Sequence, residues 1–502
     1  ILGKLTSVFN NCFNNSTFVY NWLESKMFFL YKKGNRSDAN NYRSINIQNP
    51  FLKAYMTVLS NRLSTYAEEM NLLPKFQFGF RKNRSTVSAS ALLHEVVDGR
   101  LKKGKRTYTC FVDFKKAFDS IDRTLFFQKL QEIDIPYKLC ASLFHIFNNT
   151  RIFVQAGLFL SAPFVSNIGT PQGDAIAAIL FSLFLSDLPR SIPDIGPLLG
   201  TTRISIIMYA DDLVLIAETS DDLQKMIDAL KKYCDDNRLT VNISKTKCMI
   251  FHRGRCPKTS FQYNGQELEI VKSFTYLGFI FTVQLSFTKH LEAQIVKARS
   301  RVGQLFVRLP LMDLPLDLVL KTFAVYVIPI FLYGLPMWLN ACSKSAICSM
   351  DGIFTKFLKH YVHLPPWANN ATLYFITETI PLSKYLKNRA PHTTSGLVFP
   401  ECMSGLKLSF LNFKSDHSEF TTFDPIPDIP SSFWLSKTFA TIPTNSFYRR
   451  KIIREVFDMN HREICKTTTF HKASELTCIC SQCGEHAHHY HDRFCTVNTN
   501  WD

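Results

Sequence analysis

Two apolar runs meet at a pair of aspartates in residues 203–217, and this pattern constrains the fold more than any other part of the chain. The stretch reads RISIIMYADDLVLIA, with aliphatic and β-branched residues on both sides of Ala210-Asp211-Asp212. Runs of this kind separated by a short polar break predict a β-hairpin. Two adjacent carboxylates at the tip of a buried hairpin repel each other and are costly to desolvate. For an isolated Asp-Asp pair, a solvated turn is the simpler interpretation.

A third carboxylate, Asp113, ends another predicted strand, residues 107–114 (TYTCFVDF). Taken alone, an Asp after a strand is most often the N-cap of a following helix. Together with Asp211 and Asp212 it favours a different interpretation, because a divalent cation removes both the desolvation penalty and the repulsion. Mg²⁺ takes one or two carboxylates and fills its other positions with water and phosphate oxygens. Two such ions about 4 Å apart would stabilise an attacking 3′ hydroxyl and a leaving pyrophosphate, so these residues suit nucleotidyl transfer.

The remaining hydrophobic patterns predict a chain of mixed helices and strands. Residues 175–188 are apolar nearly all round and predict a buried helix, and residues 221–236 predict an amphipathic helix. Residues 1–70 are interpreted as mixed helix and loop, and residues 286–365 as a second helical region. The apolar stretch Phe323–Leu339 contains Pro and Gly and is shorter than the roughly 20 residues of a membrane-spanning helix. We therefore expect a buried segment there and no membrane span.

The excess of basic residues indicates which kind of partner the chain binds. The chain has 502 residues with 58 Lys and Arg against 41 Asp and Glu, a formal net charge of +17. An excess of this size favours a polyanionic partner, nucleic acid first and an anionic membrane surface second. A hydrophobic content of 46% supplies a large core and excludes a disordered or low-complexity chain. Most of the 14 cysteines are scattered singly, which is typical of a reduced intracellular protein.

Seven short motifs follow one another over about 250 residues. They are Lys32–Ile45 (KKGNRSDANNYRSI), Gln77–Thr86 (QFGFRKNRST), Phe111–Arg123 (FVDFKKAFDSIDR), Gly169–Phe181 (GTPQGDAIAAILF), Tyr209–Asp212 (YADD), Leu239–Phe251 (LTVNISKTKCMIF) and Tyr276–Phe281 (YLGFIF). In this order the motifs resemble those of the reverse transcriptases of non-LTR (LINE-type) retrotransposons. The resemblance is specific over residues 20–282, thinner to about residue 370 and slight beyond that.

The resemblance implies an α+β fold of the right-hand polymerase type, with fingers, palm and thumb, followed by a helical C-terminal region and a small Cys/His-rich tail. On that fold Asp113, Asp211 and Asp212 come together as the catalytic residues and hold two Mg²⁺ ions, with Mn²⁺ as an alternative. The implied divisions are an N-terminal remnant of a longer chain (1–19), fingers and palm (20–282), thumb and helical extension (283–370), a linker or poorly defined region (371–470) and a Cys/His-rich segment (471–502).

The resemblance also implies a nucleotide-binding set. Lys32 and Arg43 fall where the fingers of such enzymes hold the triphosphate, a task that suits a Lys point charge and an Arg fork. Phe118 lies where a bulky ring excludes a 2′-hydroxyl and selects dNTPs, although a core aromatic is the alternative interpretation. Lys245 and Lys247 both match the stretch whose lysine lies near the leaving pyrophosphate, and both stay candidates.

Two further motifs are expected at the template–primer. Gly169, Gln172 and Gly173 correspond to a turn that lets the backbone approach the nucleic acid, and Gln172 also joins the nucleotide-binding set. Tyr276 and Gly278 belong to a segment that resembles the hairpin gripping the primer end.

Basic side chains form two groups that could contact phosphates. For the first group a solvated face is equally plausible, whereas the second lies where the thumb should be, so we favour nucleic-acid contact there. The first group is Lys102, Lys103, Lys105 and Arg106, and the second is Lys297, Arg299 and Arg301.

The C-terminal tail carries a potential Zn²⁺ site. Cys480, Cys483, His491 and Cys495 give Cys-x₂-Cys-x₇-His-x₃-Cys, which can close a tetrahedral site. Competing ligands and a His-rich tail without a fixed metal are the alternatives. The competing residues are Cys478, His486, His488 and His489.

These observations predict an RNA-directed DNA polymerase that uses an RNA template, a DNA primer or target, and dNTPs. The resemblance further implies target-primed integration, an intracellular protein that acts in the nucleus, and an upstream region that the chain, starting at Ile1, does not include. It leaves the oligomeric state open. The rival hypothesis is a catalytically inactive or domesticated RNA-binding protein of the same fold, and a group II intron-type maturase is a weaker enzymatic alternative. Three converging carboxylates argue against a purely binding role.

Overall fold

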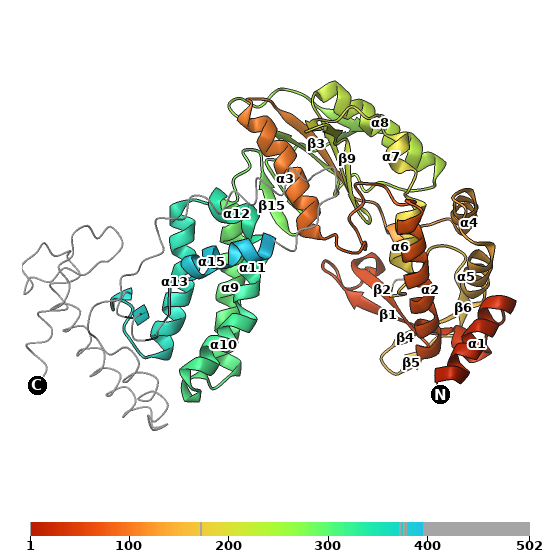
Figure 1. Ribbon diagram of the computed structural model, residues 1–502, viewed down its shortest axis with the longest axis horizontal. Helices are drawn as coiled ribbons and strands as arrows, with labels where there is room; N and C mark the ends of the chain where they lie inside the picture. The colour runs from red at the N-terminus through yellow and green to blue at the C-terminus, as the bar shows by residue number, and fades with distance from the viewer. Residues whose placement is uncertain (1, 171–172, 371–372, 375–376, 378, 395–502) are drawn as a thin grey trace, which may run out of the picture. The chain divides into compact units, whose positions relative to one another are not determined.

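The computed structural model describes residues 2–170, 173–370, 373–374, 377 and 379–394. The described chain forms two compact units, one ending at Leu285 and the other beginning at Ser286. Figure 1 shows the helices and strands of both units, coloured by residue number.

The first unit mixes helices and strands along the chain. Its helices are α1 (Leu2–Asn15), α2 (Pro50–Glu69), α3 (Thr86–Lys102), α4 (Arg123–Glu132), α5 (Tyr137–Asn149), α6 (Ala177–Phe184), α7 (Leu188–Ser191) and α8 (Ser220–Asp236). Its strands are β1 (Glu24–Tyr31), β2 (Tyr42–Gln48), β3 (Thr107–Val112), β4 (Arg151–Ala156), β5 (Phe159–Leu160), β6 (Phe164–Val165), β7 (Leu198–Leu199), β8 (Thr202–Arg203), β9 (Ile206–Tyr209), β10 (Asp212–Ala217), β11 (Lys247–Phe251), β12 (Phe261–Tyr263), β13 (Gln266–Leu268), β14 (Ser273–Tyr276) and β15 (Phe279–Thr282).

A four-stranded antiparallel sheet of order β11-β3-β10-β9 lies at the centre of this unit, with α3 and α8 packed against it (Figure 1). Every residue of β3 is buried, because both faces of the sheet are covered. Leu213 and Leu215 of β10 join one core with Leu223 of α8. On the other face, Phe111 stacks on Phe274 of β14 with ring centroids 4.3 Å apart. The strand, hairpin and helix predicted at residues 107–114, 203–217 and 221–236 are thus confirmed.

A second sheet of order β2-β1-β4-β5, with β6 also paired to β4, corrects the interpretation of residues 1–70 as helix and loop. β1 pairs with β2 in antiparallel fashion and with β4 in parallel fashion. Its sequence ESKMFFLY does not alternate, and three of its residues at the C-terminal end are exposed. β1 is therefore held by pairing with β2 and β4, and its own residue pattern does not reveal a strand.

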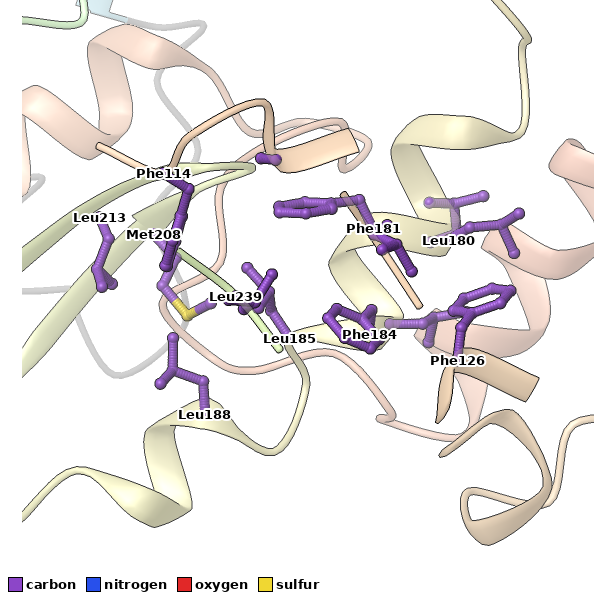
Figure 2. Packing of buried hydrophobic residues seen from close by; sticks show 14 of the residues in the cluster. Phe114, Phe126, Leu180, Phe181, Phe184, Leu185, Leu188, Met208, Leu213 and Leu239 are labelled. Atoms are coloured by element: carbon purple, nitrogen blue, oxygen red, sulfur yellow. The ribbon is translucent and has the colours of Figure 1, made fainter. Parts of the chain in front are cut away.

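The hydrophobic core of the first unit is built around α6, whose sequence AAILFSLF is buried on nearly every side. Figure 2 shows Phe181 and Phe184 of α6 beside Phe126 of α4, with Met208 of β9 and Leu213 of β10 in the same cluster. The helix predicted at residues 175–188 is confirmed, although it is shorter. A short turn at Leu185–Asp187 separates α6 from α7.

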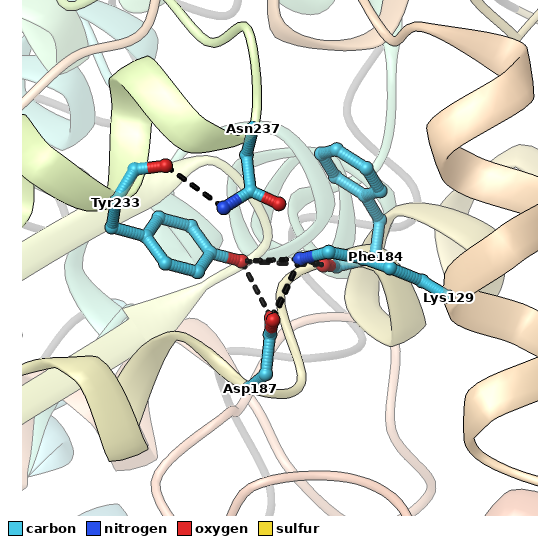
Figure 3. A network of polar contacts seen from close by, with 5 residues as sticks. All are labelled: Lys129, Phe184, Asp187, Tyr233 and Asn237. Carbon is cyan, nitrogen blue, oxygen red and sulfur yellow. Dashed lines mark hydrogen bonds and ion pairs between the residues drawn. The ribbon is translucent and has the colours of Figure 1, made fainter.

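One polar network joins three helical segments of this core (Figure 3). The ammonium of Lys129 in α4 donates to both oxygens of Asp187, at 2.9 and 2.8 Å, and to the carbonyl of Phe184 at 3.2 Å. It also contacts the hydroxyl of Tyr233 in α8, which donates to Asp187 at 2.6 Å. Burial lowers the pKa of Lys129, and the Asp187 carboxylate opposes this shift.

The second unit is helical over its described residues, as predicted for residues 286–365. Its helices are α9 (Thr288–Arg308), α10 (Leu316–Tyr326), α11 (Ile328–Leu332), α12 (Leu335–Trp338), α13 (Lys344–Tyr361) and α15 (Leu382–Thr394). The apolar stretch Phe323–Leu339 is divided among α10, α11 and α12, because Pro329, Gly334 and Pro336 interrupt it. Among the described residues, no helix is both long and apolar enough to cross a membrane. Helix α15 lies inside the region 371–470 that the sequence predicts to be a linker.

Candidate active site

The central sheet brings Asp113 and Asp212 to the same edge. In the antiparallel pairing of β3 with β10, Val112 lies opposite Leu213. One step further along this register places Asp113, the residue after β3, opposite Asp212, the first residue of β10. Two carboxylates that are far apart in the sequence therefore meet where the two strands end.

Asp211 lies in the tight turn between β9 and β10. Tyr209 pairs with Asp212, which leaves only Ala210 and Asp211 as the central residues of the turn. Ala210 has a φ of 54°, a left-handed conformation that costs a residue with a side chain about 1 kcal/mol or more. The turn is therefore held in a conformation that the surrounding structure has to stabilise.

The three carboxylates act on one another electrostatically. Burial raises the pKa of Asp211, the charge of Asp113 adds to the rise, and Arg43 and Lys245 oppose it. Partial burial raises the pKa of Asp212 to about 6, with further contributions from Asp211 and Asp113 and an opposing one from Lys245. Solvent still reaches the Asp212 side chain. The site is thus a concentration of negative charge that the protein only partly compensates.

The two candidate lysines differ in their contacts. Lys245 lies with its ammonium 3.1 Å from Oδ2 of Asp113, and its side chain is 63% exposed. Lys247 is paired instead with Glu269 at 2.7 Å. Of the two, Lys245 is the one at the carboxylates.

One oxygen of the Asp113 carboxylate could coordinate a cation. Its Oδ2 is buried and, within the described residues, accepts no hydrogen bond, so the ammonium of Lys245 contacts it only electrostatically. Its backbone is fixed, because Asp113 N donates to Oγ1 of Thr246 at 3.2 Å and Asn242 N donates to the carbonyl of Asp113 at 2.7 Å. A rigid backbone with a carboxylate oxygen that is paired with an exposed lysine and accepts no hydrogen bond fits a cation ligand.

The described residues contain no cluster of three or more His, Cys, Asp or Glu side chains that could hold a metal ion as they stand. The donor set nevertheless fits Mg²⁺, because this ion needs only one or two protein carboxylates and takes its other oxygens from water and phosphates. Burial and, after it, repulsion from neighbouring carboxylates raise the pKa of Asp211 and Asp212, and a bound cation would offset both effects.

The structure describes three further residues of the predicted nucleotide-binding set, and one of them, Arg43, acts electrostatically on the site. Arg43 is on β2 opposite Leu30 of β1, and its charge acts on Asp211. Lys32 follows β1 on the exposed turn that joins the two strands, where its backbone N–H donates to the carbonyl of Asn41 at 2.9 Å. Phe118 is half-buried, with its ring centroid 4.6 Å from that of Phe181. It therefore packs on the core and still has an accessible edge.

The glycines of the GTPQG motif make close backbone contacts. Gly169 has a φ of 73°, and a Cβ there would lie 2.6 Å from the carbonyl oxygen of Asp119. Gly173 has a φ of 108°, and a Cβ there would lie 2.7 Å from the carbonyl oxygen of Asn46 in β2. Both positions require glycine. Gln172 lies outside the described residues.

The predicted primer hairpin exists as β14 and β15. Leu277 and Gly278 form its two-residue turn with φ values of 45° and 85°, as in a type I′ turn. Tyr276 is only 3% exposed and packs against Phe111 at 5.5 Å. Burial raises the pKa of Tyr276 well above its usual value, and the charge of Asp212 adds to the rise. Contact with a primer would therefore involve the turn and not the Tyr276 ring.

Two residues with clear roles in the structure have no assigned role in the sequence interpretation. Arg123 is 7% exposed and donates to the carbonyls of Gly169 at 2.9 Å and Phe147 at 2.7 Å, which holds the loop before the GTPQG turn. Gln77 accepts hydrogen bonds from the backbone of the Ala210 turn. Arg123 lies in the motif FVDFKKAFDSIDR and Gln77 in QFGFRKNRST. Membership of these motifs is the feature of the sequence that could have pointed to them. The predicted Zn²⁺ ligands Cys480, Cys483, His491 and Cys495 lie outside the described residues.

The fold and this arrangement of carboxylates define a polymerase of mixed helices and sheets. The family described as reverse transcriptase (RNA-dependent DNA polymerase) matches residues 31–281, half of the chain, and includes Asp113, Asp211 and Asp212. The chain belongs to this reverse transcriptase family.

Curated relatives come from non-LTR retrotransposons. The chain is 25% identical over 383 residues to the probable RNA-directed DNA polymerase from transposon BS of Drosophila melanogaster, covering 74% of the chain and 42% of that protein. It is 24% identical over 379 residues to the RNA-directed DNA polymerase from mobile element jockey of the same species, covering 73% and 40%. The chain thus spans less than half the length of these relatives.

A solved structure of telomerase from Candida tropicalis in complex with a TWJ fragment of telomeric RNA is similar at a TM-score of 0.41 and 12% identity. It covers 82% of the chain and 68% of the telomerase.

Proposed function

We propose that this chain is an RNA-directed DNA polymerase that copies retrotransposon RNA into DNA. The observation that carries the proposal is the meeting of Asp113 with the Asp211-Asp212 pair at the end of β3 and β10, where burial and the charge of Asp113 raise the pKa of Asp211 and Asp212. Three converging carboxylates stabilise neither the fold nor the binding of a polyanion. They suit a site in which cations and a nucleotide triphosphate supply the compensating charge.

Asp113, Asp211 and Asp212 would hold two Mg²⁺ ions, with Mn²⁺ as an alternative. Bound there, the ions would polarise the primer 3′ hydroxyl and stabilise the leaving pyrophosphate. Lys245, whose exposed side chain has its ammonium beside Asp113, would contact the triphosphate. Zn²⁺ binding by the C-terminal Cys and His residues stays a separate proposal.

The nucleotide and nucleic-acid contacts follow from the position of each element. Arg43 on β2 would bind the triphosphate together with Lys32, and the accessible edge of Phe118 would exclude a 2′-hydroxyl. In this proposal the sheet containing β1 and β2 belongs to the fingers, the central sheet is the palm, and α9 with the helices after it forms the thumb. RNA template, DNA primer and dNTPs are the expected partners.

The names of the relatives support a further proposal. Because those proteins are polymerases of mobile elements, we propose that the chain acts in target-primed integration, in which a nicked chromosomal end serves as primer. This reaction would place the protein in the nucleus.

Primer extension tests the polymerase. The chain should extend oligo(dT) on poly(rA) with dTTP and Mg²⁺, and the Asp211→Asn/Asp212→Asn variant should lose at least about a thousandfold in rate. Asp235→Asn/Asp236→Asn is the matched control, since it neutralises two adjacent and exposed aspartates at the end of α8.

Extension by the unaltered chain and the control alone would establish the polymerase and its site together. Loss of extension in both double variants would point to a general effect of charge and count against the site. No extension by any of them, with salt-sensitive RNA binding retained, would favour the non-catalytic RNA-binding alternative.

A further inference from the structure

The segment Phe76–Phe80 pairs with the free edge of the central sheet. β9 is the last strand of that sheet, and Gln77 forms a parallel bridge with its residue Met208. Phe78 N donates to the carbonyl of Met208 at 2.7 Å, and Met208 N donates to the carbonyl of Phe76 at 2.9 Å. The segment therefore continues the sheet directly beside the turn that carries Asp211 and Asp212.

The side chain of Gln77 contacts the turn itself. Gln77 is fully buried, and its Oε1 accepts from the backbone N–H of Ala210 at 3.0 Å and from that of Gly79 at 2.9 Å. The first hydrogen bond satisfies the N–H of the one turn residue with a positive φ. A buried N–H without an acceptor costs about 1–3 kcal/mol, so this contact favours the strained conformation.

Gly79 brings the two segments closer than any other residue would allow. A Cβ at this position would lie 2.4 Å from Ala210 N and 3.0 Å from the carbonyl carbon of Tyr209. These neighbours are backbone atoms and cannot rotate away. The Phe80 ring continues the contact, 6.2 Å from the ring of Tyr209.

Two arginines hold the segment Phe76–Phe80 in place. Arg84 donates to the carbonyl of Gln77 at 3.1 Å, and Arg81 donates to the carbonyl of Pro74 at 2.7 Å. Arg81 also pairs with Glu68 of α2, to which its Nε donates at 2.7 Å. Arg81, Arg84 and helix α2 thus fix the position of Gln77, whose Oε1 accepts from Ala210 N.

We propose that Gln77 is a positioning residue for the polymerase reaction: its Oε1 fixes the Ala210 N–H and so sets the directions of the Asp211 and Asp212 carboxylates. The proposal rests on the proposed function and adds to it a residue that touches neither substrate nor cation. Gly79 also contributes to positioning the turn, because the absence of a side chain there lets Gln77 reach it.

Gln77→Met tests the proposal, since Met fills nearly the same volume and offers no comparable acceptor. We expect the rate of single-nucleotide incorporation to fall by about tenfold or more, with the affinities for dTTP and for primer–template within about threefold of the unaltered chain. Hydrogen exchange of the backbone amides over residues 206–213 should become faster, since the Ala210 N–H loses its acceptor. This second readout does not depend on activity.

Gln294→Met is the matched control, because Gln294 is also a buried glutamine and lies in the other unit, on α9. It should leave the incorporation rate and the exchange over residues 206–213 unchanged. Gly79→Ala is the second test variant, to be used also if Gln77→Met does not fold, and it should lower the rate as well.

An incorporation rate within about twofold of the unaltered chain in a folded Gln77→Met or Gly79→Ala variant, with unchanged exchange, would overturn the proposal. An equal loss in Gln294→Met would do the same. If the unaltered chain extends no primer, the proposed function fails, while the exchange comparison still decides whether Gln77 holds the turn.

Discussion

Burial raises the pKa of both Asp211 and Asp212, and the charge of Asp113 adds to the effect. A carboxyl whose pKa is higher in the folded than in the unfolded chain makes the folded state less stable as pH rises. For Asp212, with a folded pKa of about 6 and an ordinary value of 3.8, this loss accumulates between those two values and is complete above pH 6. At neutral pH and without cations, the site therefore lowers the stability of the fold.

Asp212→Asn should accordingly raise the melting temperature in the absence of divalent cations. The gain should be largest above pH 6 and shrink as pH falls toward 4, because below the unfolded pKa neither state is ionised. Thermal unfolding followed by circular dichroism in EDTA, from pH 4 to pH 8, measures it. Asp235→Asn/Asp236→Asn supplies the comparison. A melting temperature for Asp212→Asn that is unchanged or lower at pH 7.5 would contradict this account of the site.

At the scale of elements, Lys129 joins α4, α7 and α8 through a single ammonium group. Its side chain is 11% exposed and contacts Asp187, the residue that precedes α7, as well as Tyr233 of α8 (Figure 3). Phe184 ends α6, the helix that follows the GTPQG motif, and Tyr233 lies in α8, the helix that follows β10. The network therefore joins the helices that come after two segments of the site.

Lys129→Met should lower the free energy of unfolding by roughly 1–3 kcal/mol, because Asp187 loses its cation and the carbonyl of Phe184 loses a donor. Urea unfolding measures the change. Lys225→Met is the control, since Lys225 makes a more exposed pair with Asp222 at 3.6 Å and should cost less than about 0.5 kcal/mol. Equal effects of the two substitutions would show that the buried network adds no stability.

The elements that the sequence predicted are those with a regular local pattern, whether or not their strand partners are local. The hairpin of β9 and β10, strand β3 and helix α8 follow from runs of apolar residues at regular spacing. β1 and β2 escaped prediction, in the case of β1 because its residues do not alternate between apolar and polar and its burial is irregular.

The residues of the candidate site also differ in how far the sequence could predict them. Asp211 and Asp212 stand out as charges in an apolar run, whereas their meeting with Asp113 was expected only from a family resemblance. Gln77 went unassigned, because its contact with Ala210 spans 133 residues and depends on the final position of both segments. No spacing within the sequence encodes such a contact.

At the scale of the whole molecule, the net charge of +17 affects nucleic-acid binding through the positions of the basic side chains that have no carboxylate partner. In the first basic group, Lys102 is paired with Asp98 at 2.6 Å, and this partner raises the pKa of Lys102. Lys103 and Lys105 of the same group are exposed and make no ion pair in the part of the chain that the structure describes. In the second group, on α9, the exposed side chains of Lys297, Arg299 and Arg301 make no ion pair within the described residues. Cations without carboxylate partners release counterions from a nucleic acid when they bind its phosphates.

Arg299→Gln/Arg301→Gln should therefore weaken binding to an RNA–DNA primer–template and reduce its salt dependence. Each lost phosphate contact lowers the slope of log affinity against log salt by about 0.7–0.9, so loss of both contacts lowers it by roughly 1.5. Fluorescence anisotropy of a labelled duplex between about 50 and 200 mM KCl measures the slope. Lys103→Gln/Lys105→Gln removes the same charge from two exposed lysines of the first group. It should change the slope much less, because we expect nucleic-acid contact at α9 and a solvated face at the first group. Equal changes in both variants would mean that net charge, and not the position of α9, governs binding.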